Sequence, residues 1–182
     1  KLVKLGKAKI VARKDMKKDK NDLVYNGEFE FSAKQWEFYK YDTNSCDLAV
    51  DSTKQEAQIS IRDTKDVDWK IQLMQKKIPL SKGKTYRLTF DAWSTIPRKM
   101  KYACQRDGAM WKQKYGVEDW TAYNEAPTCD LTTKKQTFTQ EFTMNADDDS
   151  NVILTFSMGT IDKNISTEHD IFLDNVKLVP IN

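Results

Sequence analysis

The sequence predicts an all-β fold, an antiparallel β-sandwich of the jelly-roll type that carries one long aromatic-rich loop. Short segments in which apolar and polar residues alternate with a period of two recur along most of the chain. Turn-forming pairs such as Asn26-Gly27 and Lys82-Gly83 separate these segments at the spacing of sandwich strands. Segments with helical periodicity are few and weak. Antiparallel sheets with one face on the core and one in water produce this pattern.

Each alternating segment is expected to form a strand. In residues 86–93, for example, Tyr86, Leu88 and Phe90 share one face, and polar neighbours share the other. A polar hairpin is expected at residues 147–151. The expected strands, in chain order, are a short run at Leu23–Tyr25 and then Trp36–Tyr41, Ala57–Arg62, Trp69–Leu73, Tyr86–Trp93, Lys99–Gln105, Thr137–Met144, Val152–Met158 and Asp170–Leu178.

Residues 106–130 interrupt the strand pattern. A loop of this length in a compact domain is usually functional or disordered. Disordered loops are poor in aromatic residues, whereas this one contains Trp111, Tyr115, Trp120 and Tyr123. We therefore expect an ordered loop that folds over one end or one face of the sandwich.

The charge distribution divides the chain into a basic segment, residues 1–22, and a sandwich domain, residues 23–182. Residues 1–20 contain nine Lys or Arg and two Asp, a balance of +7, whereas residues 21–182 contain 21 basic and 25 acidic side chains, a balance of −4. Residues 1–22 are interpreted as a linker or an edge segment. An acidic body argues against nucleic acid as the partner. Apolar runs are too short for a membrane span.

The cysteines leave two alternatives open. Cys104 and Cys129 bracket the long loop and predict one disulfide with Cys46 free, while three buried free thiols are the other interpretation. A zinc site is not expected, because CxxC pairs are absent and the chain has a single histidine. That residue, His169, lies in the polar sequence Glu168-His169-Asp170, where an exposed turn position is expected.

The sequence contains none of three common catalytic motifs, namely Gly-rich phosphate loops, GxSxG and HExxH. Features of sugar recognition are present instead. A pyranose ring packs its C–H face on an aromatic plane, and its hydroxyls bond to amides, carboxylates and basic groups. The four aromatic residues of the loop are candidates, as are Lys101, Gln105 and Gln72 on polar strand faces. Each aromatic also has the alternative of packing in the core, and Trp36 is expected there.

Several short motifs follow one another in a fixed order: Asn26-Gly27-Glu28-Phe29-Glu30, Trp36, Trp69-Lys70-Ile71-Gln72-Leu73, Gly83-Lys84-Thr85-Tyr86 and Leu173-Asp174-Asn175-Val176. Together they resemble the carbohydrate-binding modules of the four/nine type. Such modules are jelly-roll sandwiches attached to bacterial glycoside hydrolases. The resemblance covers residues 23–180.

The resemblance implies a structural calcium where the start of the chain meets the closing strand. A hard cation takes six to eight oxygen ligands. The positions that match the family's ligands are Glu28, Glu30, a backbone carbonyl at Gln55 or its neighbour Glu56, and Asp174.

The resemblance also implies a sugar-binding cleft on one sheet. The matching cleft-facing positions are Tyr39, Trp69, Lys101, Gln105 and Ser157, and the 106–130 loop matches a region that supplies a stacking aromatic. Ser157 departs from the family, where an amide is common, and the loop is longer and more aromatic than expected. Both departures bear on which glycan is bound.

These observations predict a non-catalytic module that binds a β-linked polysaccharide, either β-glucan, mannan or xylan, and brings an attached glycoside hydrolase to its substrate. A monomer, secreted or at the cell surface, is expected, and a chain that starts at Lys1 is interpreted as a piece of a longer protein. The alternative is a structural or protein-interaction module of a multimodular surface protein. A small hydrolase or lyase would require His169 or a carboxylate pair in a pocket.

Overall fold

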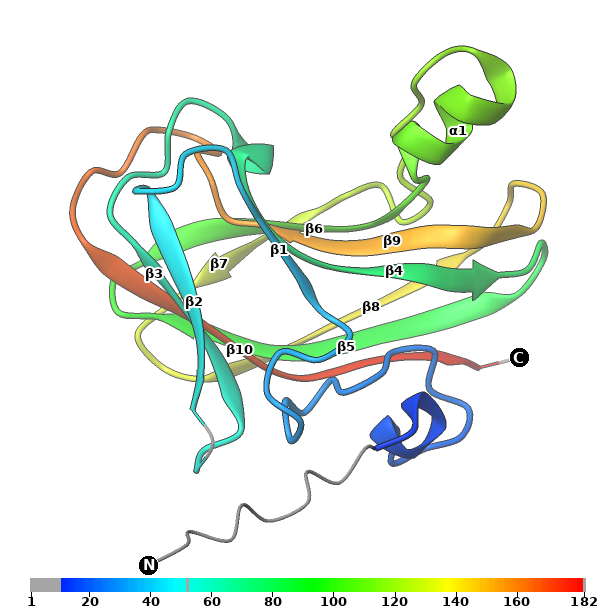
Figure 1. Ribbon diagram of the computed structural model, residues 1–182, viewed down its shortest axis with the longest axis horizontal. Helices are drawn as coiled ribbons and strands as arrows, with labels where there is room; N and C mark the ends of the chain where they lie inside the picture. Colours follow the sequence, from blue (N-terminus) through cyan, green and yellow to red (C-terminus); the bar gives the residue numbers. More distant parts are fainter. Residues whose placement is uncertain (1–10, 52, 182) are drawn as a thin grey trace, which may run out of the picture.

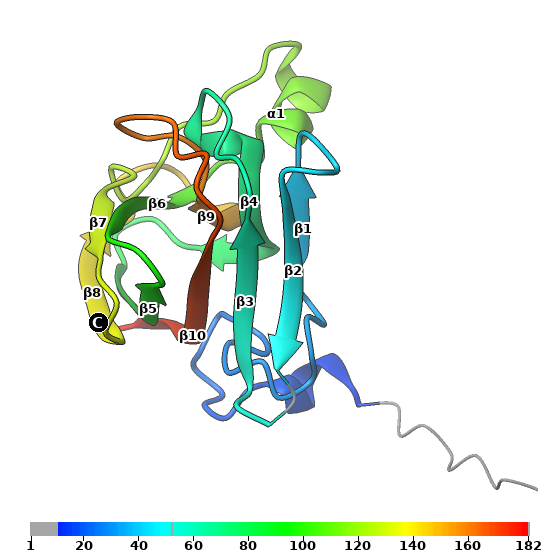
Figure 2. The same cartoon turned by 90° about the vertical axis from the view of Figure 1, so that its left-hand side faces the viewer.

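The computed structural model describes residues 11–51 and 53–181. Two five-stranded antiparallel sheets pack face to face and form the predicted β-sandwich (Figure 1). The first sheet has the order β1-β4-β9-β6-β7, and the second has the order β2-β3-β10-β5-β8. Edge strands β1 and β2 lie at one side of the sandwich, and β7 and β8 lie at the other (Figure 2).

The strands of the first sheet, in sheet order, are β1 (Glu37–Lys40), β4 (Ile71–Leu80), β9 (Asp149–Ser157), β6 (Arg98–Gln105) and β7 (Thr128–Leu131). Those of the second are β2 (Cys46–Asp51), β3 (Glu56–Ile61), β10 (His169–Pro180), β5 (Thr85–Ser94) and β8 (Gln136–Thr143). Most predicted strands agree with these within a few residues. The run Leu23–Tyr25 is not a strand, and β2 and β7 were not predicted.

The core lies between the sheets and is formed by the apolar face of each strand. Phe90 from β5 packs its ring 5.0 Å from Phe156 of β9 and 4.9 Å from Tyr102 of β6, measured between ring centroids. Both contacts are edge-to-face, which aromatic pairs prefer. Trp36 is buried and stacks on Phe29, so its predicted core position is confirmed.

Residues 11–22 run along the sandwich beside the end of β10. A short 3₁₀ helix, η1 (Arg13–Met16), places Met16 in a buried position. The buried carboxylate of Asp22 accepts hydrogen bonds from the backbone amides of Val24, at 2.9 Å, and Leu178, at 3.0 Å. The predicted basic segment also includes residues 1–10, which lie outside the described residues.

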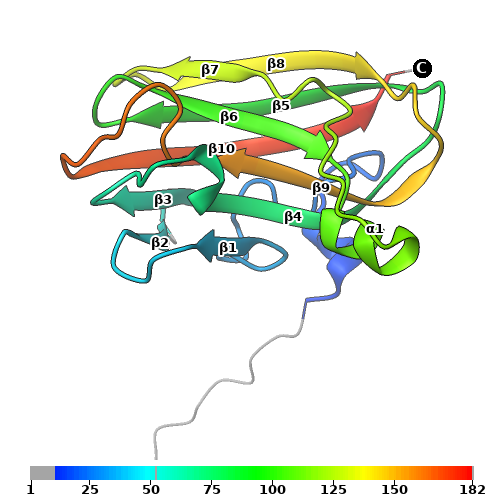
Figure 3. The same cartoon turned by 90° about the horizontal axis from the view of Figure 1, so that it is seen from above.

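The 106–130 region is not one irregular loop, as its sequence suggested. It contains the helix α1 (Gly108–Tyr115) and strand β7. The side chain of Asp107 caps the helix by accepting a hydrogen bond from the Met110 amide at 3.1 Å. Gly116 ends the helix in the left-handed conformation, φ 81°, which glycine adopts without steric cost. The helix stands over one end of the first sheet (Figures 1 and 3).

The predicted Cys104–Cys129 disulfide is wrong, and the alternative of three buried free thiols is the one observed. Strands β6 and β7 pair so that Cys129 lies opposite Met100. Cys104 is four residues farther along β6, roughly 13 Å by the rise of a strand. A disulfide requires Cα atoms within about 7 Å.

Within residues 11–51 and 53–181, the longest helix is far too short and too polar to cross a membrane.

Candidate functional site

A row of side chains crosses the outer face of the first sheet at right angles to its strands. The strand registers align one residue from each of the five strands, because each is the Cα partner of the next. The row consists of Tyr39, Gln72, Ser157, Lys101 and Thr128. Neighbours such as Leu73, Phe156 and Tyr102 point into the core, so the row faces away from it. We call this set the transverse row.

The transverse row carries hydrogen-bonding groups that already contact one another. The Gln72 amide donates to Ser157 Oγ at 3.0 Å. The Lys101 ammonium lies 2.9 Å from the Asp68 carboxylate, which belongs to the short helix η2 (Asp68–Lys70). An amide, a hydroxyl, an ammonium and a carboxylate are the groups that bond to sugar hydroxyls from both the donor and the acceptor side.

A second row on the same face, two positions from the transverse row along each strand, consists of poorly exposed residues that form a floor. Thr155 lies opposite Met74 on one side and Ala103 on the other, and the three are 2 to 9% exposed although they are outside the main core cluster. Among the described residues, Thr155 Oγ1 is the buried side-chain polar atom without a hydrogen-bond partner. Sequence reasoning missed this floor. The signal available was parity, since Thr155 and Ser157 share a face of the same strand.

Two aromatic residues border the face at the end where β4 begins. Trp69, in η2, is 45% exposed, and Tyr39, in the transverse row, is 40% exposed. The alternation of residues 69–73 allowed a core position or a rim position for Trp69, and the structure places it at the rim. Its ring meets Tyr41 edge-on at 6.1 Å. That contact fixes the orientation of Trp69 and leaves the ring at the rim.

Trp120 borders the face at the opposite end, near α1. Its indole lies against Gly108, where an added Cβ would come within 2.3 Å of the ring. Glycine is therefore required at the first position of α1 for Trp120 to pack there. The Trp120 side chain is still 48% exposed. Gln105 lies at the foot of this region, because it forms a β-bridge with Ala122.

The other three aromatic residues of this region line a groove of about 680 Å³ between α1 and residues 147–151. The hairpin predicted at 147–151 is wrong, because β8 and β9 on either side belong to different sheets and do not pair. Trp111 packs against the Arg106 guanidinium, 4.0 Å from the ring centroid, and against Tyr115, 4.2 Å between centroids. Tyr123 donates its hydroxyl hydrogen bond to Asp149 at 2.8 Å. Burial, together with this bond to a carboxylate, raises the pKa of Tyr123 to about 12. The predicted loop aromatics thus separate into Trp120 at the rim and Trp111, Tyr115 and Tyr123 in the groove.

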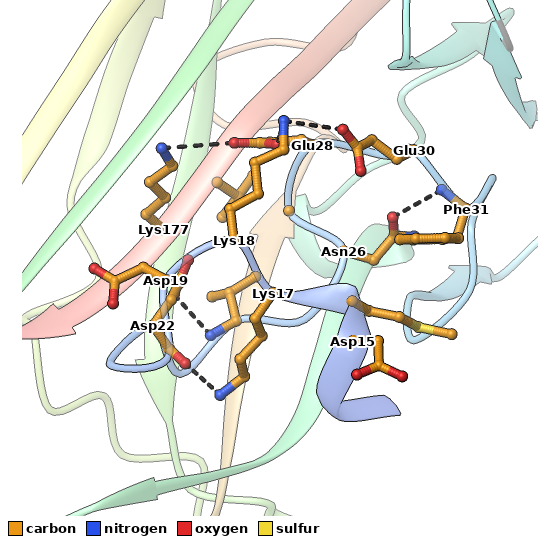
Figure 4. Close-up of a pocket in the computed structure, with 14 residues that line it drawn as sticks. Asp15, Lys17, Lys18, Asp19, Asp22, Asn26, Glu28, Glu30, Phe31 and Lys177 are labelled. Atoms are coloured by element: carbon orange, nitrogen blue, oxygen red, sulfur yellow. Dashed lines mark hydrogen bonds and ion pairs between the residues drawn. The ribbon is translucent and has the colours of Figure 1, made fainter. Parts of the chain in front are cut away.

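The four predicted calcium ligands fall into separate groups. Glu28 and Glu30 both pair with the Lys18 ammonium (Figure 4), whereas Asp174 pairs with Lys135 at 2.7 Å. Gln55 lies in the turn between β2 and β3 with φ 57°. Among the described residues, no three His, Cys, Asp or Glu side chains are grouped so as to hold a metal ion. The residues as arranged do not fit the six to eight oxygens that calcium takes.

His169 is not the exposed turn residue that its polar neighbours suggested. It begins β10, is 4% exposed, and has its Nε2 atom 2.6 Å from Arg98 Nη1. Its Nδ1 atom lies 2.7 Å from the carbonyl oxygen of Thr167. Both ring nitrogens are therefore used in holding the end of the sandwich together.

The sequence also matches a known protein family. A family model described as a carbohydrate binding domain matches residues 21–166. The chain belongs to this family. The recognition made from sequence motifs is thereby confirmed, and with it a carbohydrate-binding rather than a catalytic role for this domain.

Individual relatives agree with the family assignment. A cellulose 1,4-beta-cellobiosidase of Acetivibrio thermocellus is 27% identical over 165 residues, which are 87% of this chain and 18% of the relative. The chain thus spans less than a fifth of that protein. A solved CBM4 structure has 27% identity and a TM-score of 0.68, covering 86% of this chain and 99% of the other.

More distant structures share the fold. The N-terminal cellulose-binding domain of Cellulomonas fimi β-1,4-glucanase C superimposes with a TM-score of 0.60 at 15% identity, over 86% of this chain and 93% of that domain. A CBM22-1 xylan-binding domain from Paenibacillus barcinonensis gives a TM-score of 0.58 at 12% identity, over 88% and 95%. At these identities the likeness concerns the sandwich alone.

Proposed function

We propose that this carbohydrate-binding domain holds a β-linked polysaccharide across the outer face of its first sheet, with the transverse row under the glycan. The observation that carries the proposal is the placement of exposed aromatics at the two ends of one polar face. Trp69 belongs to η2, and Trp120 lies beside α1. Aromatic planes at both ends with hydrogen-bonding side chains between them match the alternation of apolar ring faces and hydroxyl edges along a sugar chain.

The two sheets differ in a way that favours the first. On the outer face of the second sheet, Trp93 and Phe172 stack on each other with centroids 5.0 Å apart and ring planes 10° apart. Lys135 covers the Trp93 ring at 4.9 Å. These aromatics are therefore engaged within the protein, whereas Trp69 and Trp120 keep nearly half of their surface in water.

Within this proposal, a β-1,4-linked glucan is the first glycan to test, with mannan and xylan as the other two classes. The support is the cellobiosidase relative, since that enzyme is named for a cellulose substrate. The same relative supports attachment to a glycoside hydrolase, because the chain matches only 18% of its length, and a secreted or cell-surface location is part of the proposal. The domain then acts by raising the local concentration of a tethered catalytic domain at its polymer.

Affinity per site is expected to be weak, with Kd on the order of micromolar to millimolar, because sugar hydroxyls exchange water hydrogen bonds for protein ones at little net gain. Affinity electrophoresis suits this range. The purified domain is run through gels that contain β-glucan, mannan, xylan or no polymer. Slower migration in one polymer gel supports the proposal and identifies the glycan class. Equal mobility in all four gels contradicts it, and a structural or protein-interaction role would then explain the domain better.

A further inference from the structure

A lysine ammonium lies between two of the carboxylates that the family resemblance assigns to calcium. Lys18 Nζ contacts Glu28 and lies 2.9 Å from the Glu30 carboxylate (Figure 4). Lys177 Nζ adds a second positive charge 3.6 Å from Glu28. Two acidic side chains are thus matched by two cations. The hydrogen bonds to both glutamates raise the pKa of Lys18, so the ammonium keeps its charge across the physiological range.

The position of Lys18 follows from how its segment packs. Met16 is buried, and its carbonyl oxygen accepts a hydrogen bond from the Asn26 amide at 2.7 Å. The Tyr25 ring contacts Arg13 at 4.2 Å and Lys17 at 4.0 Å. These contacts fix the segment immediately before Lys18. They also come from residues that precede the family match, which begins at residue 21.

A second lysine contacts Asp174, the predicted calcium ligand of the closing strand. Lys135, in the turn between β7 and β8, lies 2.7 Å from Asp174 and 3.6 Å from Asp91. The Asn175 amide donates to both of these carboxylates, at 3.1 Å to Asp174 and 2.8 Å to Asp91. The Asp174 carboxylate is therefore paired and hydrogen-bonded, and it is 8% exposed.

Calcium and an ammonium group satisfy carboxylates by different means. Calcium requires six to eight oxygens around one point, whereas a lysine supplies one charge and three donors to two or three oxygens. The groups around Lys18 and Lys135 have the second arrangement, with two carboxylates per ammonium. Lys135 also ties together segments that are distant in sequence, since Asp91 belongs to β5 and Asp174 to β10, as a bound ion would.

We propose that Lys18 and Lys135 take the structural role that the family resemblance assigns to calcium, so that this domain folds without a metal ion. The N-terminal segment from Arg13 to Asp22 is then part of the folded unit. This proposal does not depend on which glycan is bound, and its test uses stability alone.

The first test is thermal unfolding of the full chain, monitored by circular dichroism. The protein is dialysed against EDTA beforehand. Tm is measured in EDTA, in millimolar calcium chloride and in magnesium chloride at matched ionic strength. A ligand that binds only the folded state raises Tm. Equal Tm in the three buffers is expected. A rise in Tm specific to calcium would overturn the proposal.

The second test compares two pairs of substitutions that remove the same charge. Lys18→Gln with Lys135→Gln removes both ammonium groups, while the control, Lys20→Gln with Lys134→Gln, removes exposed lysines of the same segments. The first pair is expected to lower Tm by several degrees more than the control. Equal losses in the two pairs would show that the lysines do not stand in for the ion.

Discussion

Arg98 Nη1 lies 2.6 Å from Nε2 of His169, and the two side chains are 8% and 4% exposed. An arginine is always a donor, so Nε2 must accept, and Nδ1 carries the proton that it donates to the Thr167 carbonyl oxygen. This arrangement requires a neutral imidazole. It joins β6 to the start of β10. Burial lowers the pKa of His169, with the Arg98 charge acting in the same direction, and burial lowers the pKa of Arg98 to about 10.

The free energy of unfolding should therefore fall as the pH drops below the ordinary histidine pKa of 6.5. Above that pH His169 is neutral in both states, and its contribution is fully present. Below it the unfolded chain binds a proton that the folded chain binds only at lower pH, so protonation favours unfolding. The loss levels off below the lowered folded pKa. Urea unfolding between pH 7.5 and 5.5 measures this slope.

The His169→Gln variant is the control for this effect, because its amide oxygen still accepts from Arg98 and does not titrate. Its unfolding free energy should vary less with pH over the same range. A slope equal to that of the unsubstituted chain would mean that other groups cause the pH dependence.

The three cysteine thiols should be unreactive in the folded protein. Burial raises the pKa of Cys104 and of Cys129 to about 12, and burial also raises that of Cys46. The thiolate is the reactive form, so alkylation at neutral pH should be slow until the chain unfolds. Mass spectrometry after iodoacetamide treatment should show zero labels without denaturant and three labels with it. Two protected cysteines in the denatured, unreduced sample would indicate a disulfide.

Substitution Thr155→Val should separate binding from stability. The two side chains have nearly the same shape, and Thr155 Oγ1 is buried without a hydrogen-bond partner among the described residues. Removing an unsatisfied hydroxyl leaves stability unchanged or raises it by about 1 kcal/mol. If the hydroxyl bonds to the glycan once the flexible Met74 side chain moves, affinity should fall several-fold. Thr155→Ser keeps the hydroxyl and should bind more tightly than Thr155→Val. Equal affinity of all three proteins would remove Thr155 from the binding face.

The sandwich was predictable because its strands show period-two alternation that depends only on local sequence. Strand β2 carries the same signal at Cys46, Leu48 and Val50, so it too was predictable, although it was not predicted. Helix α1 is different, since Gly108 is the only residue of the helix that is buried. An exposed helix shows no apolar stripe. Its remaining signals were the capping residues Asp107 and Gly116.

The candidate site was predictable where it depends on strand parity and not where it depends on long-range packing. Tyr39, Lys101 and Ser157 align because each occupies the polar phase of its own strand. Burial of His169 depends on Arg98, which is 71 residues away, and local sequence contains no sign of that contact. The ion pair between Lys18 and Glu28 was likewise not predictable, because it depends on where the N-terminal segment packs.

The central claim is that the outer face of the first sheet, and not that of the second, binds the glycan. Isothermal titration calorimetry of three variants tests this claim. The ligand is the polymer that slows the domain in affinity electrophoresis. Trp69→Ala and Trp120→Ala each remove an exposed rim aromatic, and Trp93→Ala removes an indole from the second sheet. The account predicts at least a tenfold loss of affinity, about 1.4 kcal/mol, for Trp69→Ala and for Trp120→Ala, with Trp93→Ala binding as the unsubstituted domain does. A loss confined to Trp93→Ala, with the other two unchanged, would contradict it.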